Sequence, residues 1–111
     1  MKNIVFLISM IFAFGSVKAQ KIYSVDYSSQ ADINVFVVDY ASQADLNVYK
    51  VDYLSQAGKN DGKWFFVEYA SQSDKKIYFV DYASQADLKI YFVDYASQAG
   101  WNQSSKKSLM Y

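Results

Sequence analysis

A thirteen-residue repeat constrains this chain more than any other feature of its sequence. The segment KIYFVDYASQAD at residues 76–87 is followed, after a single leucine, by KIYFVDYASQAG at 89–100. Looser copies come earlier, and all copies are marked by the acidic residue of a Val–acid–Tyr element: Asp26, Asp39, Asp52, Glu68, Asp81 and Asp94. Because chance does not hold such a register over most of a chain, the sequence predicts six copies of one structural unit.

The six copies form two matching triplets. Successive acidic residues lie 13, 13, 16, 13 and 13 positions apart, and the longer step contains the insertion GKNDGK at 58–63. Adding 42 to the numbers of the first triplet gives those of the second, as 26 + 42 = 68 shows. Both triplets end on SQAG, where the inner copies have SQAD or SQSD. We expect two intertwined halves related by a pseudo-two-fold axis, with a change of chain direction where glycine replaces aspartate.

The composition favours strands over helices. Aromatic residues make up 19 % of the 111 residues, with 11 Tyr and 8 Phe, and the chain contains no proline. Flat and β-branched side chains suit a pleated surface, and alternation with period two fits each copy better than a helical period. The sequence therefore predicts one all-β, barrel-like domain over residues 20–101. Each copy is expected to form one short strand, such as IYFVDYA at 77–83, followed by one bend.

The repeat also predicts which side chains are buried. Two positions are the same in every copy, and we expect them to line the interior: Val25, Val38, Val51, Val67, Val80 and Val93, and Tyr27, Tyr40, Tyr53, Tyr69, Tyr82 and Tyr95. The position of Phe79 is occupied by Lys50 in another copy, which indicates contact with water. The Ile or Val at the strand start is expected to cover a second, thinner layer.

The SQAD element is predicted to be the bend. Serine and aspartate side chains can bond to nearby backbone groups and stabilise a turn without proline or glycine. Ladders of repeated Ser, Gln and Asp that bind ions or sugars are the alternative. The bend is the preferred interpretation because the element occurs in every copy, whereas a single site would need it once.

The first nineteen residues have the layout of a secretory signal peptide. Lys2 gives the positive start, Ile4 to Phe14 form a short apolar run, and Val17 and Ala19 occupy the −3 and −1 positions of a cut after Ala19. The run is shorter than the ~20 residues that span a bilayer. We expect cleavage, no remaining membrane span, and a periplasmic or secreted protein.

The repeated motif resembles the septoil-knot family of small bacterial repeat proteins. The resemblance rests on tandem VDYxSQAD at thirteen-residue spacing and on the joint NDGKWFFVEY, and it covers residues 21–101. Glu68, Ser73 and Lys50 depart from the clean repeat without conflicting with the fold. The resemblance implies a deeply knotted β domain whose backbone forms a torus knot of seven crossings, with no established biochemical activity. Composition and spacing alone support an intertwined or barrel-like domain.

Several function classes are disfavoured by what the chain lacks. It contains no Cys and no His, so a thiol nucleophile and the usual general base near neutral pH are missing. Eleven basic residues, all lysine, balance eleven acidic ones, so no strong field attracts nucleic acid. KNDGK at 59–63 is too short for a calcium loop. We expect no enzyme, no metal and no cofactor, and instead a stable structural or interaction module.

Binding through aromatic side chains is the alternative function. Five residues are candidates for a stacking platform on the outer face, with a glycan, a cell-surface component or the protein itself as partner: Trp64, Phe66, Phe79, Phe92 and Trp101. Trp64 and Trp101 equally fit caps that seal the ends of the two triplets. The polar segment NQSSKKSLMY at 102–111 breaks the repeat and is predicted to be a flexible end.

Overall fold

The computed structural model describes residues 20–111, and the predicted signal peptide lies outside them. The strands among these residues are β1 (Gln20–Ser24), β2 (Ile33–Val37), β3 (Leu46–Lys50), β4 (Lys63–Phe66), β5 (Lys75–Phe79), β6 (Leu88–Phe92) and β7 (Gly100–Trp101). Each of β1 to β6 is followed by a loop and one turn of 3-10 helix: η1 (Ser28–Gln30), η2 (Ala41–Gln43), η3 (Leu54–Gln56), η4 (Ala70–Gln72), η5 (Ala83–Gln85) and η6 (Ala96–Gln98). A seventh 3-10 segment, η7 (Ser104–Met110), ends the chain.

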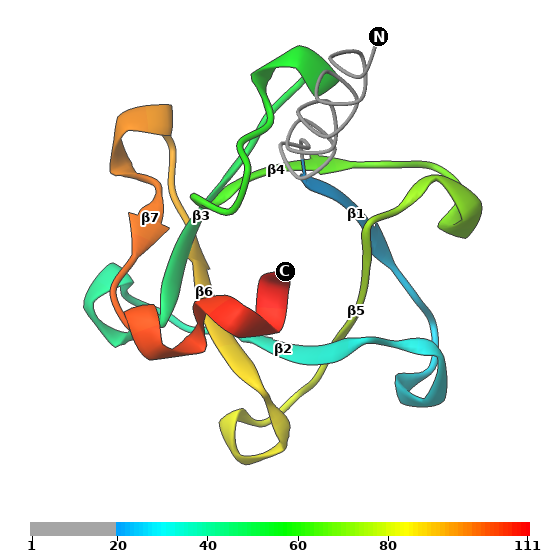
Figure 1. Cartoon of the computed structure of the whole chain (residues 1–111). Helices are drawn as coiled ribbons and strands as arrows, with labels where there is room; N and C mark the ends of the chain where they lie inside the picture. The colour runs from blue at the N-terminus through cyan, green and yellow to red at the C-terminus, as the bar shows by residue number, and fades with distance from the viewer. Residues whose placement is uncertain (1–19) are drawn as a thin grey trace, which may run out of the picture.

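Six strands close into a parallel barrel. Their order is β4-β1-β5-β2-β6-β3, and β3 pairs with β4 to complete the ring. All six pairings are parallel, and each joins a strand of the first triplet to a strand of the second. Figure 1 shows the strands around a ring, with the loops and their 3-10 turns projecting outward between them. The predicted intertwining of the two halves is confirmed.

The offset of 42 residues appears in the strands themselves. Adding 42 to the bounds of β2 gives those of β5, and adding 42 to the bounds of β3 gives those of β6. The chain also changes direction where Gly100 replaces aspartate, because β7 runs antiparallel to β3. At the joint, Gly62 has φ of +89°, and a Cβ there would lie 2.4 Å from the backbone oxygen of Asn47. Only glycine fits this close approach of the two halves.

The centre of the barrel core is a layer of six equivalent side chains, and the Ile and Val residues that were predicted to cover a second, thinner layer belong to it. The inward residue at the middle of each barrel strand has no exposed surface: Ile22, Val35, Val48, Trp64, Ile77 and Ile90. In each triplet these residues are 13 positions apart, and the two sets differ by 42. A closed barrel of this size is filled by side chains from every strand. The repeat therefore supplies one filling residue per copy.

The prediction that the six repeat tyrosines line the interior was wrong. The strands end before the Val–acid–Tyr element, so the strand predicted at 77–83 is β5 at 75–79, and the six tyrosines lie in the loops with 62–67 % of their surface exposed. The valines are partly or largely buried, with Val25, Val38 and Val51 at 8 %. The opposite face of each strand, which carries Ile77 and Phe79, points inward. Lys50 suggests from the sequence that this face is the outer one, but Lys50 ends β3 and its ammonium reaches water from there.

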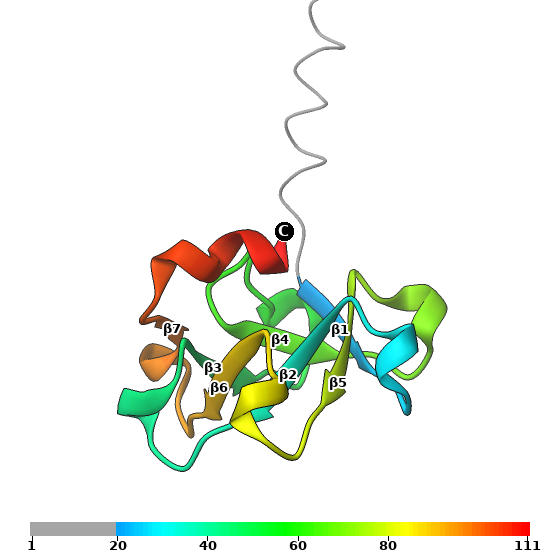
Figure 2. The ribbon, with the colours of Figure 1, turned by 90° about the horizontal axis from the view of Figure 1, so that it is seen from below.

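The segment after the repeats is not a free end. It crosses one end of the barrel, as Figure 2 shows, where Met110 is buried to 3 % exposure and Leu109 packs against the core. Gln20 donates from Nε2 to the Met110 carbonyl over 3.1 Å, and Asn60 donates from Nδ2 to the Lys107 carbonyl over 3.1 Å. The prediction of a flexible tail missed the apolar pair Leu109–Met110, which plugs the barrel.

The corrected core gives a stability test. We expect Ile90→Ala to lower the free energy of unfolding by about 2–5 kcal/mol, because it opens a cavity in the filled layer. Tyr95→Ala, at an exposed loop position that is constant in all six copies, should change it by about 0.5 kcal/mol or less. Equilibrium urea unfolding measures both. Equal losses in the two variants would contradict the assignment of the inward face.

Candidate functional site

Three of the predicted aromatic residues lie at the end of the barrel where its strands terminate, which we call the aromatic mouth. The six barrel strands end, in order around the ring, on Phe66, Ser24, Phe79, Val37, Phe92 and Lys50. The three phenylalanines are half-buried and pack against the core. The Lys50 Nζ lies 5.5 Å from the ring centroid of Phe66 and 5.2 Å from that of Phe92. This distance permits a cation–π contact, so Lys50 covers part of the aromatic mouth with a charge that faces water.

The two tryptophans lie elsewhere. Trp64 belongs to the central core layer and meets Phe66 edge to face, with ring centroids 6.1 Å apart. A fully buried ring cannot take part in an outer stacking platform. Trp101 in β7 is half-buried, packs against the core and donates from Nε1 to the Asn60 carbonyl over 2.8 Å. The structure thus places the three phenylalanine candidates at the strand ends, Trp64 in the core layer against Phe66, and Trp101 in β7.

The aspartates of the SQAD elements tie the two halves of the barrel together. Asp32 donates its backbone N–H to the Lys76 carbonyl over 2.7 Å, and its carboxylate accepts the Lys76 N–H over 2.8 Å. The same reciprocal pair of bonds joins Asp45 to Lys89, Asp74 to Lys21 and Asp87 to Asn34. Each aspartate therefore clamps a strand of the other triplet. The prediction of local side-chain bonds was wrong for these aspartates: backbone bonds, such as that from the Gln43 N–H to the Tyr40 carbonyl, close the 3-10 turns, and the carboxylates act across the sheet.

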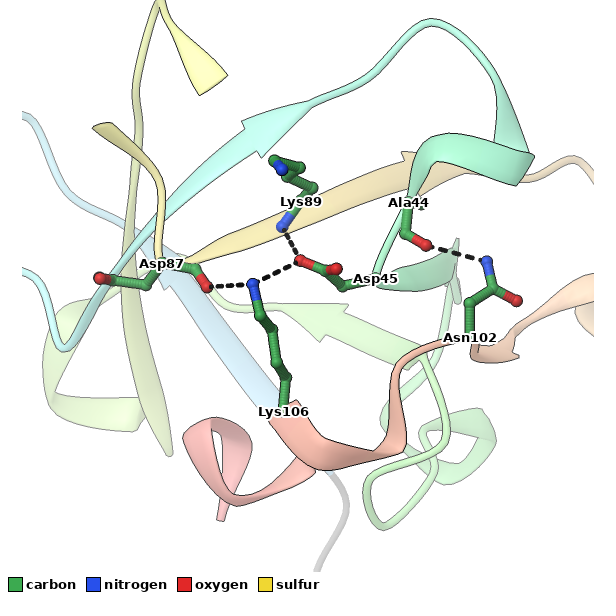
Figure 3. Close-up of polar contacts among 6 residues, drawn as sticks. All are labelled: Ala44, Asp45, Asp87, Lys89, Asn102 and Lys106. Carbon is green, nitrogen blue, oxygen red and sulfur yellow. Dashed lines mark hydrogen bonds and ion pairs between the residues drawn. The ribbon is translucent and has the colours of Figure 1, made fainter. Parts of the chain in front are cut away.

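Asp45 also holds the C-terminal segment (Figure 3). Its Oδ2 accepts from Lys106 Nζ at 3.1 Å as well as from the Lys89 N–H at 2.9 Å, and the side chain is nearly buried. Lys106 Nζ donates further to the Asp87 carbonyl over 3.4 Å, and Asn102 donates from Nδ2 to the Ala44 carbonyl over 3.0 Å. These contacts hold the C-terminal segment against the second and fifth copies of the repeat.

The six exposed tyrosines form a rim around the barrel. Each follows an exposed Asp or Glu and precedes a 3-10 turn, so an acid and a phenol ring project from every loop. The backbone groups of these tyrosines are hydrogen-bonded. The Tyr53 N–H, for example, donates to Gln56 Oε1 over 3.1 Å, and the Gln56 N–H donates to the Tyr53 carbonyl over 2.9 Å. The side chains are not needed for packing, which leaves them available to partners.

The barrel wall carries a groove that the sequence did not predict. It has a volume of about 300 Å³ and is lined by Ala41, Asn47, Tyr91, Phe92, Val93, Asp94 and Gln98. One signal was present in the sequence: Asn34 and Asn47 occupy a position that is lysine in the other four copies. Among residues 20–111, no group of three or more acidic, His or Cys side chains is arranged to hold a metal ion. Nor is any helical segment of that range long and apolar enough to cross a bilayer.

Comparison with protein families decides the identity of this arrangement. A family model described as the 7(1) septoil knot domain matches residues 19–102, which is most of the chain and all six copies of the repeat. The chain belongs to the septoil knot family. Comparisons with curated proteins and with solved structures returned no match.

The septoil knot gives the alternating strand order a physical meaning. Two plies that wind about each other must place each turn of one ply between turns of the other, and every strand of this barrel has its hydrogen-bonded neighbours in the opposite triplet. Knotted backbones are close to absent from proteins. Here the repeats make the winding steps alike, and the aspartate clamps hold four of the six strand pairings.

The clamp at Asp45 gives a second stability test. We expect Asp45→Ala to lower the free energy of unfolding by about 1–3 kcal/mol, because it leaves a backbone N–H and the Lys106 ammonium without their acceptor. Asp39→Ala, which removes an exposed acid of the rim, should cost about 0.5 kcal/mol or less. Urea unfolding checks the difference, and amide exchange in residues 104–110 should quicken in Asp45→Ala alone. Equal behaviour of the two variants would contradict the clamp.

Proposed function

We propose that this septoil knot is an exported structural or interaction module whose winding makes it slow to unfold. The observation that carries the proposal is the strand order, in which no strand has a hydrogen-bonded neighbour from its own triplet. Opening one copy of the repeat cannot release its half of the barrel, because strands of the other half flank it on both sides. Outside the cytoplasm, survival depends on the rate of unfolding more than on equilibrium stability.

The proposal includes export. It is supported by the charge, apolar run and small residues of positions 1–19 and by the absence of cysteine from the chain, which leaves packing and topology to stabilise the protein. We expect the exported protein to begin at Gln20, which intact-mass measurement of the extracytoplasmic fraction would reveal. A mass that includes residues 1–19 would contradict cleavage. No catalytic activity is proposed, since the chain has neither the His nor the Cys on which such chemistry commonly depends.

The kinetic part of the proposal has its own test. A protease site inserted at the tip of the joint, after Lys59, allows the folded protein to be cut between its triplets without removing a strand. We expect cutting to raise the unfolding rate on the order of tenfold or more, because the separated halves can unwind without threading the chain. Stopped-flow or manual-mixing unfolding in urea measures the rates. The control is the same variant left uncut, and identical rates before and after cutting would rule out a topological barrier.

A second candidate function is binding to carbohydrate or to a cell-surface component through exposed aromatic residues. The observation that favours it is the rim of six exposed tyrosines, each beside an acidic residue, together with the half-buried phenylalanines of the aromatic mouth. Aromatic rings stack on the C–H faces of sugars, and carboxylates accept hydrogen bonds from hydroxyl groups. The repeated loops would present the same contacts several times, which raises avidity for a repetitive polymer.

A further inference from the structure

The groove on the barrel wall is built from both halves of the chain. Asn47 of β3 and Tyr91 of β6 are direct register partners in adjacent parallel strands, so their side chains are neighbours on the outer face. The loop after β6 adds Asp94 and Gln98, and Ala41 of η2 supplies the opposite edge. The groove therefore places an amide, a phenol ring and a carboxylate side by side in about 300 Å³.

The groove contains a buried acceptor that nothing satisfies. Asn47 Oδ1 has no hydrogen-bond partner among residues 20–111 and is shielded from solvent. A buried acceptor without a partner costs about 1–3 kcal/mol, so native structures rarely keep one without a reason. The equivalent pair one repeat earlier, Asn34 and Tyr78, has the same register but no such orphan atom. The difference lies beside β3, where β7 pairs with Asn47 through Gly100 in place of an aspartate clamp.

The lining residues select the chemistry of a ligand. No cationic side chain lines the groove, so an anion would meet only the repulsion of Asp94. The Asn47 Oδ1 and the Asp94 carboxylate both accept hydrogen bonds and call for a ligand with donors. Gln98 uses its Oε1 to accept the Tyr95 N–H over 3.3 Å, so its Nε2 is the group that it offers as a donor. The Tyr91 ring adds an apolar face.

We propose that this groove binds one pyranose unit of a neutral glycan. Hydroxyl groups would donate to Asp94 and, once rotation of the Asn47 amide turns Oδ1 into the groove, to Asn47; another would accept from Gln98, and the C–H face of the ring would lie on Tyr91. The volume is at the lower end of ligand pockets, which suits one sugar ring rather than a large molecule. This inference rests on the second candidate function and replaces the aromatic mouth with Asn47, Tyr91, Asp94 and Gln98 as the contact residues.

Titration of the full chain with single sugars tests the groove directly. The probes are methyl β-D-glucopyranoside, methyl α-D-mannopyranoside and methyl N-acetyl-β-D-glucosaminide, followed by amide chemical shifts in NMR. We expect at least one probe to give saturable shifts confined to residues 41, 47 and 91–98, with an affinity on the order of millimolar. Shifts centred on Phe66 and Phe79, or on the exposed tyrosines of the other five loops, would overturn the assignment, as would a response to tetramethylammonium chloride alone.

Matched variants separate binding from folding. Tyr91→Ser should weaken the best probe by about tenfold or more, whereas Tyr78→Ser, at the equivalent place one repeat earlier, should change affinity less than about twofold. Asn47→Leu, which removes the orphan acceptor while keeping side-chain bulk, should also weaken binding. Urea midpoints for all three variants show which of them are folded under the titration conditions. Equal affinities for Tyr91→Ser and Tyr78→Ser would overturn the proposal.

A retention experiment distinguishes failure of the groove from failure of glycan binding as a whole. The full chain, Tyr91→Ser and the double variant Phe66→Ser, Phe79→Ser are passed over an immobilised neutral polysaccharide such as mannan or cellulose; Phe92 is left unchanged because it also lines the groove. Loss of retention in Tyr91→Ser alone supports the groove. Retention that survives Tyr91→Ser but not the double variant overturns the groove and leaves carbohydrate binding at the phenylalanines of the strand ends. No retention of the unmodified chain overturns both.

Discussion

The structure depends on one constraint: every barrel strand is hydrogen-bonded on both sides to strands of the other half of the chain. The aspartate clamps join residues 44 or 53 positions apart, and no pair of barrel strands within a triplet is adjacent. Such non-local pairing must overcome the loop-closure entropy before it gains any stabilisation, so folding of this chain is expected to be slow. The same constraint leaves the wound state without a strand that can detach on its own, which links the topology to the proposed extracytoplasmic role.

How much the sequence could predict depended on whether a pattern was local or non-local. The spacings of 13 and 42 predicted the six barrel strands, the equivalence of the two triplets and the direction change at Gly100, because identical steps of sequence fold into identical steps in space. The seventh strand, β7, was not predicted. The prediction that successive side chains of each strand point to opposite faces was also correct, but this alternation does not show which face lies inside the barrel. Lys50 suggested the wrong face, since a lysine at the end of an inward row can still reach water. The exposed tyrosines show that a position constant in all six copies need not be a core position.

The candidate site was beyond prediction for the same reason. Asn47 and Tyr91 are far apart in sequence, and only the register of β3 on β6 makes them neighbours. The SQAD pattern predicts local bonds of these aspartates within the bend, whereas their carboxylates accept from backbone N–H groups of the opposite half. In both cases the residue type indicated that the side chain makes polar contacts, but the sequence did not show which residue it contacts. The plug formed by Leu109 and Met110 was hidden by the polar residues around it, although two adjacent apolar side chains suffice to close one end of so narrow a barrel.

The six copies of the repeat would by themselves give six equivalent positions around the barrel. Positions that differ from the others arise where the sequence departs from the repeat. Gly62 permits the close approach at the joint, Gly100 starts the antiparallel strand beside β3, and the orphan acceptor of Asn47 occurs where that strand replaces a clamp. Because the groove takes one wall from each triplet, it exists only when the winding is complete. A ligand that binds there binds the wound state alone and stabilises it by mass action. Binding and topology would then support each other: the knot assembles the groove, and an occupied groove further opposes unwinding.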